Sequence, residues 1–226
     1  MSPRRPRLAK VRPPAADAVD TPWRLFLAVP LPDDVRRLVA EQISSLEREG
    51  WPVRWVAPDA AHVTLHFLGE TPPERAELLR IALPGAVARH APFDLRTAAF
   101  GVFPSFRAPR VLWLGLHGPV HRLETLQREL GRTLAGLELP VGDEPYHPHI
   151  TLGRVRKGDE IKRRIRGIPD AIKRRFVDAA SGAAVAPPSQ PVPVREVLLM
   201  RSHLDKEGAR YETIGSYPLR GQGDAA

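Results

Sequence analysis

The chain has 226 residues, with 42% hydrophobic and 27% charged residues, which is a globular composition long enough for one large domain or two small lobes. The absence of cysteine excludes disulfides, cysteine nucleophiles and thiolate metal sites. No apolar run approaches the roughly 20 residues that span a bilayer, and the basic start lacks the apolar core of a secretory signal, so we expect a cytoplasmic protein. The net charge of +8 favours a polyanionic partner.

Hydrophobic spacing predicts strands that alternate with helices along most of the chain. Residues 1–21 are basic and rich in proline, so we expect a disordered tail there. The predicted elements are, in chain order, a strand at Arg24–Pro30, a helix at Asp33–Arg48, strands at Val53–Val56 and His62–Leu68, a helix at Pro73–His90, strands at Phe93–Phe103 and Val111–Leu116, a helix at Pro119–Leu137, a strand at Ile150–Val155, and strands at Val194–Leu204 and Ala209–Leu219.

Residues 156–193 interrupt this pattern with a basic helical stretch, 156–175, followed by a segment rich in Ala, Pro and Ser. We expect them to form an insertion within a single domain over 22–220, with a flexible end at 221–226. The many adjacent strand pairs predict an α+β fold with antiparallel sheets, in place of a doubly wound parallel sheet.

Two strands carry the same tetrad, His62-Val-Thr64-Leu and His149-Ile-Thr151-Leu. Side chains at i and i+2 of a strand share a face, so each histidine lies beside its threonine while the apolar residues enter the core. An imidazole next to a hydroxyl suits phosphate-ester chemistry, because the imidazole moves a proton and the hydroxyl donates a hydrogen bond to a phosphate oxygen. One such tetrad is usually structural, but two copies favour catalysis.

Several neighbours of these motifs are candidates for binding. Arg154 and Arg110 are candidates to neutralise phosphate charge, with a surface ion pair as the alternative for each. Phe103 and Phe106 are candidates to stack a nucleobase, although core packing explains Phe103 equally well. His66 shares the face of His62 if the strand stays regular.

Metal binding is the alternative use of these histidines. His147 and His149 could join His62 as three imidazole ligands, but no acidic residue sits beside either motif in a ligating pattern. His117 and His121 have helical spacing without the acid of H-E-x-x-H. We therefore expect no metal and no other cofactor. The absence of a glycine-rich phosphate loop disfavours ATP-driven chemistry.

The chain resembles the two-histidine (2H) phosphoesterases, in the branch called RNA 2′,3′-cyclic phosphodiesterases and also 2′-5′ RNA ligases. The resemblance covers about 23–155 and 194–220 and lies in RLFLAVPLP, HVTLHFLGE, GVFPSFRAPRVLWLGL, PYHPHITLGR and LLMRSHLDKEGARYETIGSYPL. It implies two α+β lobes related by a pseudo-twofold axis, with both motifs facing a central cleft. The basic tail and the enlarged segment 156–193 depart from the family pattern.

The resemblance also implies roles for individual residues. His62 is expected to be the general acid (proton donor), His149 the general base (proton acceptor), and Thr64 and Thr151 the phosphate ligands. The implied reaction is metal-independent hydrolysis of RNA 2′,3′-cyclic phosphate ends to a 2′-phosphate and a 3′-hydroxyl. Chemistry by itself requires one protonated and one neutral imidazole and leaves open which is which.

Two other functions stay open on the sequence. One is reversible 2′-5′ RNA ligation, which needs only an RNA 5′-hydroxyl in place of water, and the other is a non-catalytic RNA-binding module. The expected partners are RNA ends or nucleotides bearing a 2′,3′-cyclic phosphate. We expect a monomer, because no heptad or exposed apolar stripe stands out.

Overall fold

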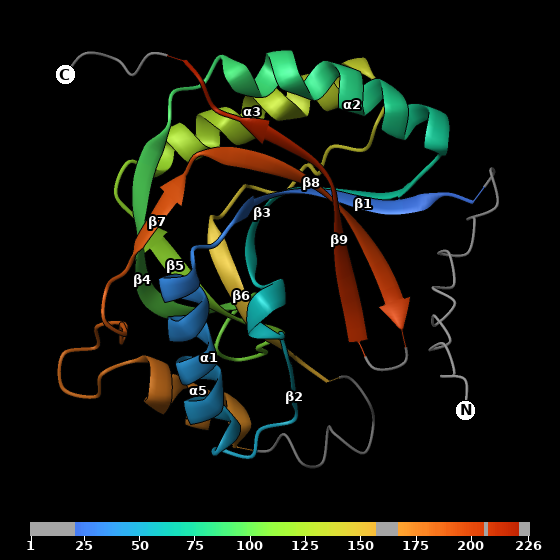
Figure 1. Cartoon of the computed structure of the whole chain (residues 1–226). Helices are drawn as coiled ribbons and strands as arrows, with labels where there is room; N and C mark the ends of the chain where they lie inside the picture. Colours follow the sequence, from blue (N-terminus) through green and yellow to red (C-terminus); the bar gives the residue numbers. More distant parts are fainter. Residues whose placement is uncertain (1–20, 157–166, 206–207, 222–226) are drawn as a thin grey trace, which may run out of the picture.

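A computed structural model describes residues 21–156, 167–205 and 208–221 (Figure 1). The predicted basic tail, apart from residue 21, the stretch 157–166 of the predicted insertion, and residues 222–226 lie outside the described residues. No helix within the described ranges is long and apolar enough to cross a membrane.

The strands form a curled sheet in which every pairing is antiparallel. Their order is β7-β4-β5-β6-β3-β1-β8-β9, with β2 paired to β6 off this path. The strands are β1 (Trp23–Pro30), β2 (Val53–Trp55), β3 (His62–Thr71), β4 (Phe93–Phe103), β5 (Val111–His117), β6 (His149–Val155), β7 (Pro191–Val194), β8 (Glu196–Asp205) and β9 (Gly208–Pro218).

The sheet consists of two halves that meet at β3 and β6. One half is β7-β4-β5-β6 and the other is β3-β1-β8-β9, and Val63 opposite Ile150 is the register pair that joins them. The two central strands carry the H-x-T-L tetrads. The predicted α+β class with antiparallel sheets in two related lobes is therefore confirmed, and the duplicated motif lies where the lobes join.

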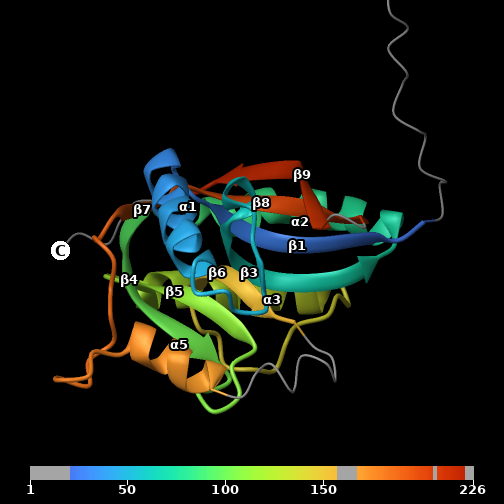
Figure 2. The same cartoon turned by 90° about the horizontal axis from the view of Figure 1, so that it is seen from below.

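Helices cover the two halves separately. Helices α2 (Pro73–Ala88) and α3 (Val120–Gly136) lie side by side at the top of Figure 1, and α1 (Asp33–Glu47) and α5 (Ile168–Phe176) lie at the opposite end. Seen from below, α1 and α5 lie in front of the strands and α2 and α3 behind them (Figure 2). The apolar faces of α1 and α3 are buried, as their leucine and valine spacing predicts.

Strand β7 corrects the prediction that residues 156–193 contain only helix and loop. The strand comprises Pro191–Val194 and pairs with β4 alone, at the end of the sheet. Proline lacks a backbone N–H, so prolines within a sheet are confined to such edges, where one side of the backbone needs no partner. Val192 and Val194 point into the core, while Pro191 is exposed. The alternation of buried valines with prolines in this strand is not recognisable in a segment so rich in proline.

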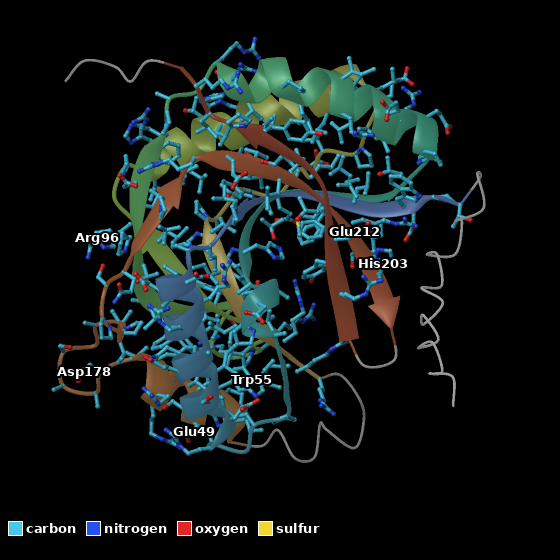
Figure 3. The ribbon with its side chains drawn as sticks, in the orientation of Figure 1. Glu49, Trp55, Arg96, Asp178, His203 and Glu212 are labelled. Carbon is cyan, nitrogen blue, oxygen red and sulfur yellow. The ribbon has the colours of Figure 1, made fainter. Side chains whose placement is uncertain are left out.

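The segment before β7 is packed against the β4 half. Phe176 of α5 is fully buried and stacks on Phe100 at 4.8 Å between ring centroids. The loop after α5 carries Asp178, which accepts hydrogen bonds from Ser181, and Arg96 donates to the Ser189 carbonyl at 3.0 Å (Figure 3). Of the basic residues in the last turn of α5, Lys173 and Arg174 are exposed, whereas Arg175 lies 3.3 Å from Ser45 Oγ and 3.8 Å from Glu49 Oε1 of the α1 region.

Candidate active site

The register between β3 and β6 brings the two tetrads together. Val63 lies opposite Ile150, and both side chains are buried. Continuing this antiparallel register by one residue each way places His62 beside Thr151 and Thr64 beside His149. The two histidines are thus diagonal neighbours, a relation that separates residues by about 7–8 Å across a sheet. This gap accommodates a phosphate between the imidazoles.

Both imidazoles are oriented by a hydrogen bond to the backbone carbonyl two residues earlier in the chain. His62 Nδ1 lies 2.8 Å from the Ala60 carbonyl oxygen, and His149 Nδ1 lies 2.7 Å from the His147 carbonyl oxygen. A carbonyl only accepts, so each Nδ1 must carry a proton and donate it. In the neutral ring Nε2 is then the free base, and in the charged ring Nε2 is the acid. Each motif therefore presents Nε2 for proton transfer.

A bulge follows the leucine of each tetrad. In β3 the pairing with β1 skips Leu65, and in β6 the pairing with β5 skips Leu152. An extra residue in one strand reverses the faces of those that follow it. Phe67 and Arg154, three positions after the threonines, consequently emerge on the side of the histidines, where both line one cavity with His62. They are equivalent positions in the two halves, one aromatic and one cationic.

The same bulge explains the position of His66. The strand is not regular beyond Leu65, and His66 is buried with Nε2 2.7 Å from the Gln127 carbonyl oxygen of α3. The condition for His66 to share the face of His62 is therefore not met. Phe67 takes that face instead.

The environment of His62 is a cavity of about 380 Å³ between β1, β3, β6 and the β8–β9 hairpin. Its ring lies 4.8 Å from that of Phe26 and 5.4 Å from that of Tyr211, measured between centroids. The lining residues that bear polar or charged groups are Arg24, His62, Thr64, Thr151, Arg154, Ser202 and Tyr211. Three of the four motif residues thus border one cavity, together with two arginines.

The hairpin that carries Tyr211 is tied together on its other face. Ser202 and Tyr211 are opposite each other in the β8–β9 register and face the cavity. His203 and Glu212, one residue further along each strand, meet on the opposite face with 2.9 Å between Nε2 and Oε2 (Figure 3). This pair links β8 to β9 on the face opposite Tyr211.

His149 has a different aromatic neighbourhood. The Phe103 ring meets it nearly perpendicularly at 5.0 Å, and the Trp113 ring lies 6.2 Å away. Trp113 and Phe103 also contact the ring of His147, whose carbonyl orients His149. These contacts fix the ring plane of His149 from the side away from His62.

The pKa values of both imidazoles are lowered from the usual 6.5 of histidine. Burial is the main cause in each case, because it disfavours the charged ring. The hydrogen bond to the backbone carbonyl opposes this in each. Charge repulsion lowers the pKa further, from His149 and Arg154 at His62, and from His147 and Arg154 at His149. Arg154 thus acts on both rings.

Other predicted residues lie further from the histidines. Arg110 is exposed at the start of β5, with its backbone hydrogen-bonded to Phe103 and Val155, and its side chain does not line the cavity of His62. Phe106 packs against the hydrophobic core. His117 lies near Ser189, at 3.3 Å, and His121 lines a separate cavity at the start of α3.

The three-imidazole arrangement considered for a metal does not form. Within the described residues, no group of three or more histidine or acidic side chains is placed to hold a metal ion.

Sequence reasoning missed the contributions of β1 and the final hairpin. Arg24 and Phe26 alternate along β1 onto the cavity, and Ser202 and Tyr211 reach it from β8 and β9. The segment containing Ser202 and Tyr211 contributed to the family resemblance, which was the only signal available for them. Phe67 was visible next to the first motif, but an unbulged strand would direct it elsewhere.

Gly101 allows Trp113 to lie flat against β4 beside His149. A Cβ atom at Gly101 would stand 2.1 Å from the indole ring. We expect Gly101→Ala to lower the free energy of unfolding by about 1–3 kcal/mol, because the indole must move. Denaturant unfolding would measure this, and the NMR resonances of His149 would shift. Gly85→Ala on α2, where a Cβ meets nothing within 4 Å, is the matched control. It should leave the His149 resonances unchanged and should not destabilise the fold, because alanine is favoured over glycine inside a helix by about 0.5–1 kcal/mol. Equal stabilities of the two variants would contradict the packing described.

Residues 31–206 match the model of the 2′-5′ RNA ligase superfamily, which is more than half of the chain. The chain belongs to the 2′-5′ RNA ligase superfamily of two-histidine phosphoesterases. The family expected from the paired tetrads is thereby confirmed, and the two motifs of this superfamily member lie at the junction of its lobes.

Two relatives carry the same name. The RNA 2′,3′-cyclic phosphodiesterase of Thermus thermophilus is 34% identical over 212 residues, which cover 88% of this chain and 91% of that protein. The protein of the same name from Geobacillus stearothermophilus is 32% identical over 200 residues, and the match covers 88% of this chain but 58% of that protein.

Solved structures share the fold. A crystal structure of a Thermus thermophilus protein has a TM-score of 0.69 at 30% identity and covers 88% of this chain and 99% of that one. Escherichia coli LigT complexed with 3′-AMP has a TM-score of 0.63 at 27% identity, covering 88% and 98% of the two chains.

Proposed function

We propose that this protein hydrolyses the 2′,3′-cyclic phosphate at the end of an RNA, leaving a 2′-phosphate and a 3′-hydroxyl. The observation that carries the proposal is the pair of diagonal imidazoles, each with Nδ1 bonded to a backbone carbonyl, beside two threonines and Arg154. The names of the Thermus and Geobacillus relatives support the substrate. The complex of Escherichia coli LigT with 3′-AMP, a nucleotide phosphate, supports it further.

In the proposed mechanism the phosphate lies between the two Nε2 atoms. His149 Nε2 takes a proton from a water molecule as its oxygen attacks phosphorus. The bond from phosphorus to O3′ breaks on the opposite side, and His62 Nε2 gives its proton to O3′. The assignment of acid and base follows the family resemblance. The proton taken up by His149 and the proton lost by His62 are exchanged with solvent before the next turnover.

The remaining motif residues bind the phosphate. The hydroxyl groups of Thr64 and Thr151 donate hydrogen bonds to the two non-bridging oxygens, and the Arg154 guanidinium offsets their negative charge. These groups stabilise the charge that grows on the oxygens as the nucleophile adds, which is the general basis of oxyanion stabilisation. Each reaction step uses only side chains of the chain and water.

The test uses an oligoribonucleotide that ends in a 2′,3′-cyclic phosphate, incubated with the protein and EDTA. Phosphorus NMR should show the cyclic phosphate signal replaced by that of a 2′-phosphomonoester. A cyclic phosphate that persists, or a turnover that EDTA abolishes, would contradict the proposal. A protein that binds the RNA with ordinary salt dependence and never turns it over would be an RNA-binding module instead.

The lowered pKa values predict an acidic optimum for kcat/KM. The reaction requires a neutral His149, which is lost as the pH falls through the pKa of that ring, and a protonated His62, which is lost as the pH rises through its pKa. Both values lie below 6.5, so we expect a bell-shaped profile with its maximum below pH 6.5. Steady-state rates at subsaturating substrate measure it. The profile of kcat should lie at higher pH, because bound phosphate favours the charged rings. A maximum of kcat/KM above 6.5 would contradict the environment described.

A further inference from the structure

The two strands that carry the H-x-T-L tetrads meet over a short stretch. Val63 opposite Ile150 is the register pair between β3 and β6, whereas β1 pairs with β3 along its whole length. Among the described residues, this pairing does not continue to Thr64 and His149. A contact outside the sheet ladder is therefore needed to hold the start of β6 at a fixed position relative to β3.

Tyr146 supplies such a contact, three residues before His149. Its hydroxyl donates a hydrogen bond to the Thr64 carbonyl oxygen, with 3.1 Å between the two oxygens. The ring packs against the hydrophobic core, which fixes the direction of the hydroxyl. Burial raises the pKa of Tyr146, so the hydroxyl keeps its proton and the bond persists at neutral pH. The segment that leads into β6 is thereby tied to the strand of the other motif.

The residue after Tyr146 orients the proposed general base. The His147 carbonyl oxygen accepts the hydrogen bond of His149 Nδ1 at 2.7 Å. Pro148 follows, and a residue before proline is restricted to an extended backbone. The peptide that carries this carbonyl is therefore stiff, and its direction depends on what holds its two ends. One end continues into β6, where His149 pairs with Gly115, and the other end is Tyr146.

The segment contacts both lobes of the fold through consecutive side chains. The ring of His147 lies 5.3 Å from that of Phe103 in β4 and 5.0 Å from that of Trp113 in β5, measured between centroids. Tyr146, one residue earlier, bonds to β3 in the other lobe. The His147 carbonyl thus lies where one short segment joins the two lobes, and the hydroxyl of Tyr146 is the bond that reaches β3.

We propose that Tyr146 is a positioning residue, whose hydroxyl holds the His147 carbonyl where it keeps the proton of His149 on Nδ1. The inference rests on the proposed function, in which His149 is the base. Without the bond to Thr64, the peptide between His147 and Pro148 is free to tilt, and the hydrogen bond to Nδ1 weakens. The proton then moves to Nε2 in part of the molecules. An imidazole with a proton on Nε2 cannot take one from water there.

The variant Tyr146→Phe removes the hydroxyl and keeps the ring. We expect kcat for hydrolysis of adenosine 2′,3′-cyclic phosphate to fall about tenfold to a hundredfold, the scale of loss when a reacting group is misplaced by up to about an ångström. KM should stay close to that of the wild type, because the side chains of Thr64, Thr151 and Arg154 are unchanged and binding of the ground state is not removed. Steady-state kinetics measure both constants.

The pH profile provides a readout that a loss of stability would not move. The hydrogen bond to the His147 carbonyl raises the pKa of His149 against the effect of burial. Weakening this bond should lower the pKa of His149, so the acidic limb of the profile should move to lower pH. The basic limb, which His62 sets, should stay in place. His147 and Arg154, the charged or titratable groups that act on His149, are retained in the variant.

Nitrogen NMR of the imidazoles follows the proton itself. In Tyr146→Phe the share of the Nε2–H tautomer should rise at His149. It should stay unchanged at His62, whose Nδ1 bonds to the Ala60 carbonyl and serves as the internal reference. The two rings are thus compared within one sample, under identical conditions.

Two further variants serve as controls. Tyr217→Phe removes the hydroxyl of another buried tyrosine, which bonds to Arg80 on the side of α2, and should leave kcat and the His149 tautomer unchanged. In the His149→Ala background, Tyr146→Phe should not lower the residual rate further, because the imidazole that it positions is gone and the two changes are coupled.

Three results would overturn the inference. The first is an unchanged kcat and an unchanged His149 tautomer in Tyr146→Phe. The second is a fall in rate by the same factor in the His149→Ala background, which would indicate damage to the whole cleft. The third applies if the wild-type protein does not hydrolyse the cyclic phosphate, so that the proposed function fails. The NMR spectra then decide by themselves, and an unchanged tautomer would overturn the positioning role, whereas a larger share of Nε2–H would support it.

Discussion

Replacing His149 by alanine should lower kcat/KM for hydrolysis of a 2′,3′-cyclic phosphate by about 10²–10⁴-fold, and His62→Ala should have an effect of the same order. Each imidazole has Nδ1 bonded to a backbone carbonyl, which leaves Nε2 as the proton carrier of one half of the proposed reaction. The double variant should be little worse than either single variant, because residues that act as a unit do not contribute additively. Single-turnover rates with a cyclic nucleotide measure the loss.

The control for this pair is another histidine outside the cleft. His121→Ala removes an exposed imidazole from the start of α3 and should retain full activity. RNA affinity should survive in both catalytic variants, since the arginines of the cleft are untouched. Activity in His149→Ala above about a tenth of the wild type would contradict the proposed role, given the range expected for a general base.

A change of leaving group separates the acid from the base. A phosphodiester substrate that releases p-nitrophenolate needs no proton on its leaving oxygen. The His62→Ala variant should recover most of its rate with such a substrate, and His149→Ala should not. Recovery in His149→Ala alone would reverse the assignment taken from the family resemblance.

Replacing Arg154 by alanine should lower kcat/KM by about 10²-fold or more, the loss typical of removing one group that stabilises charge in the transition state. The guanidinium lines the cavity of His62, Thr64 and Thr151, and its charge lowers the pKa of both imidazoles. Arg154→Lys should recover only part of the rate, because an ammonium cannot make the paired hydrogen bonds of a guanidinium.

A second readout distinguishes this role from a structural one. Removing the positive charge should raise the pKa of His62 and of His149, so both limbs of the pH profile should move to higher pH in Arg154→Ala. NMR titration of the two imidazoles would follow the same shift. Arg110→Ala is the comparison, because Arg110 was an equal candidate on the sequence but lies outside the cavity of His62. A larger loss in Arg110→Ala than in Arg154→Ala would contradict the site described.

The sequence by itself predicted which side chains carry the proposed chemistry. The repeated H-x-T-L fixed which side chains share a face, because alternation along a strand is a local property. The sequence periodicity also placed the boundaries of most helices and strands within a few residues, since burial of one helix face or one strand face leaves a pattern of apolar residues. Strand β7 was not predicted from the sequence, because two of its four residues are prolines, which a sheet tolerates at its edge.

The tertiary structure decided what surrounds those side chains. The pairing of Val63 with Ile150 made diagonal neighbours of histidines far apart in the chain, and strand register depends on packing between elements that no local pattern records. The bulges after Leu65 and Leu152 turned Phe67 and Arg154 toward the cleft and His66 away from it. The paired H-x-T-L motifs thus specify the proposed proton carriers, while the different neighbours of the two motifs arise from register and bulges, which are set by long-range contacts.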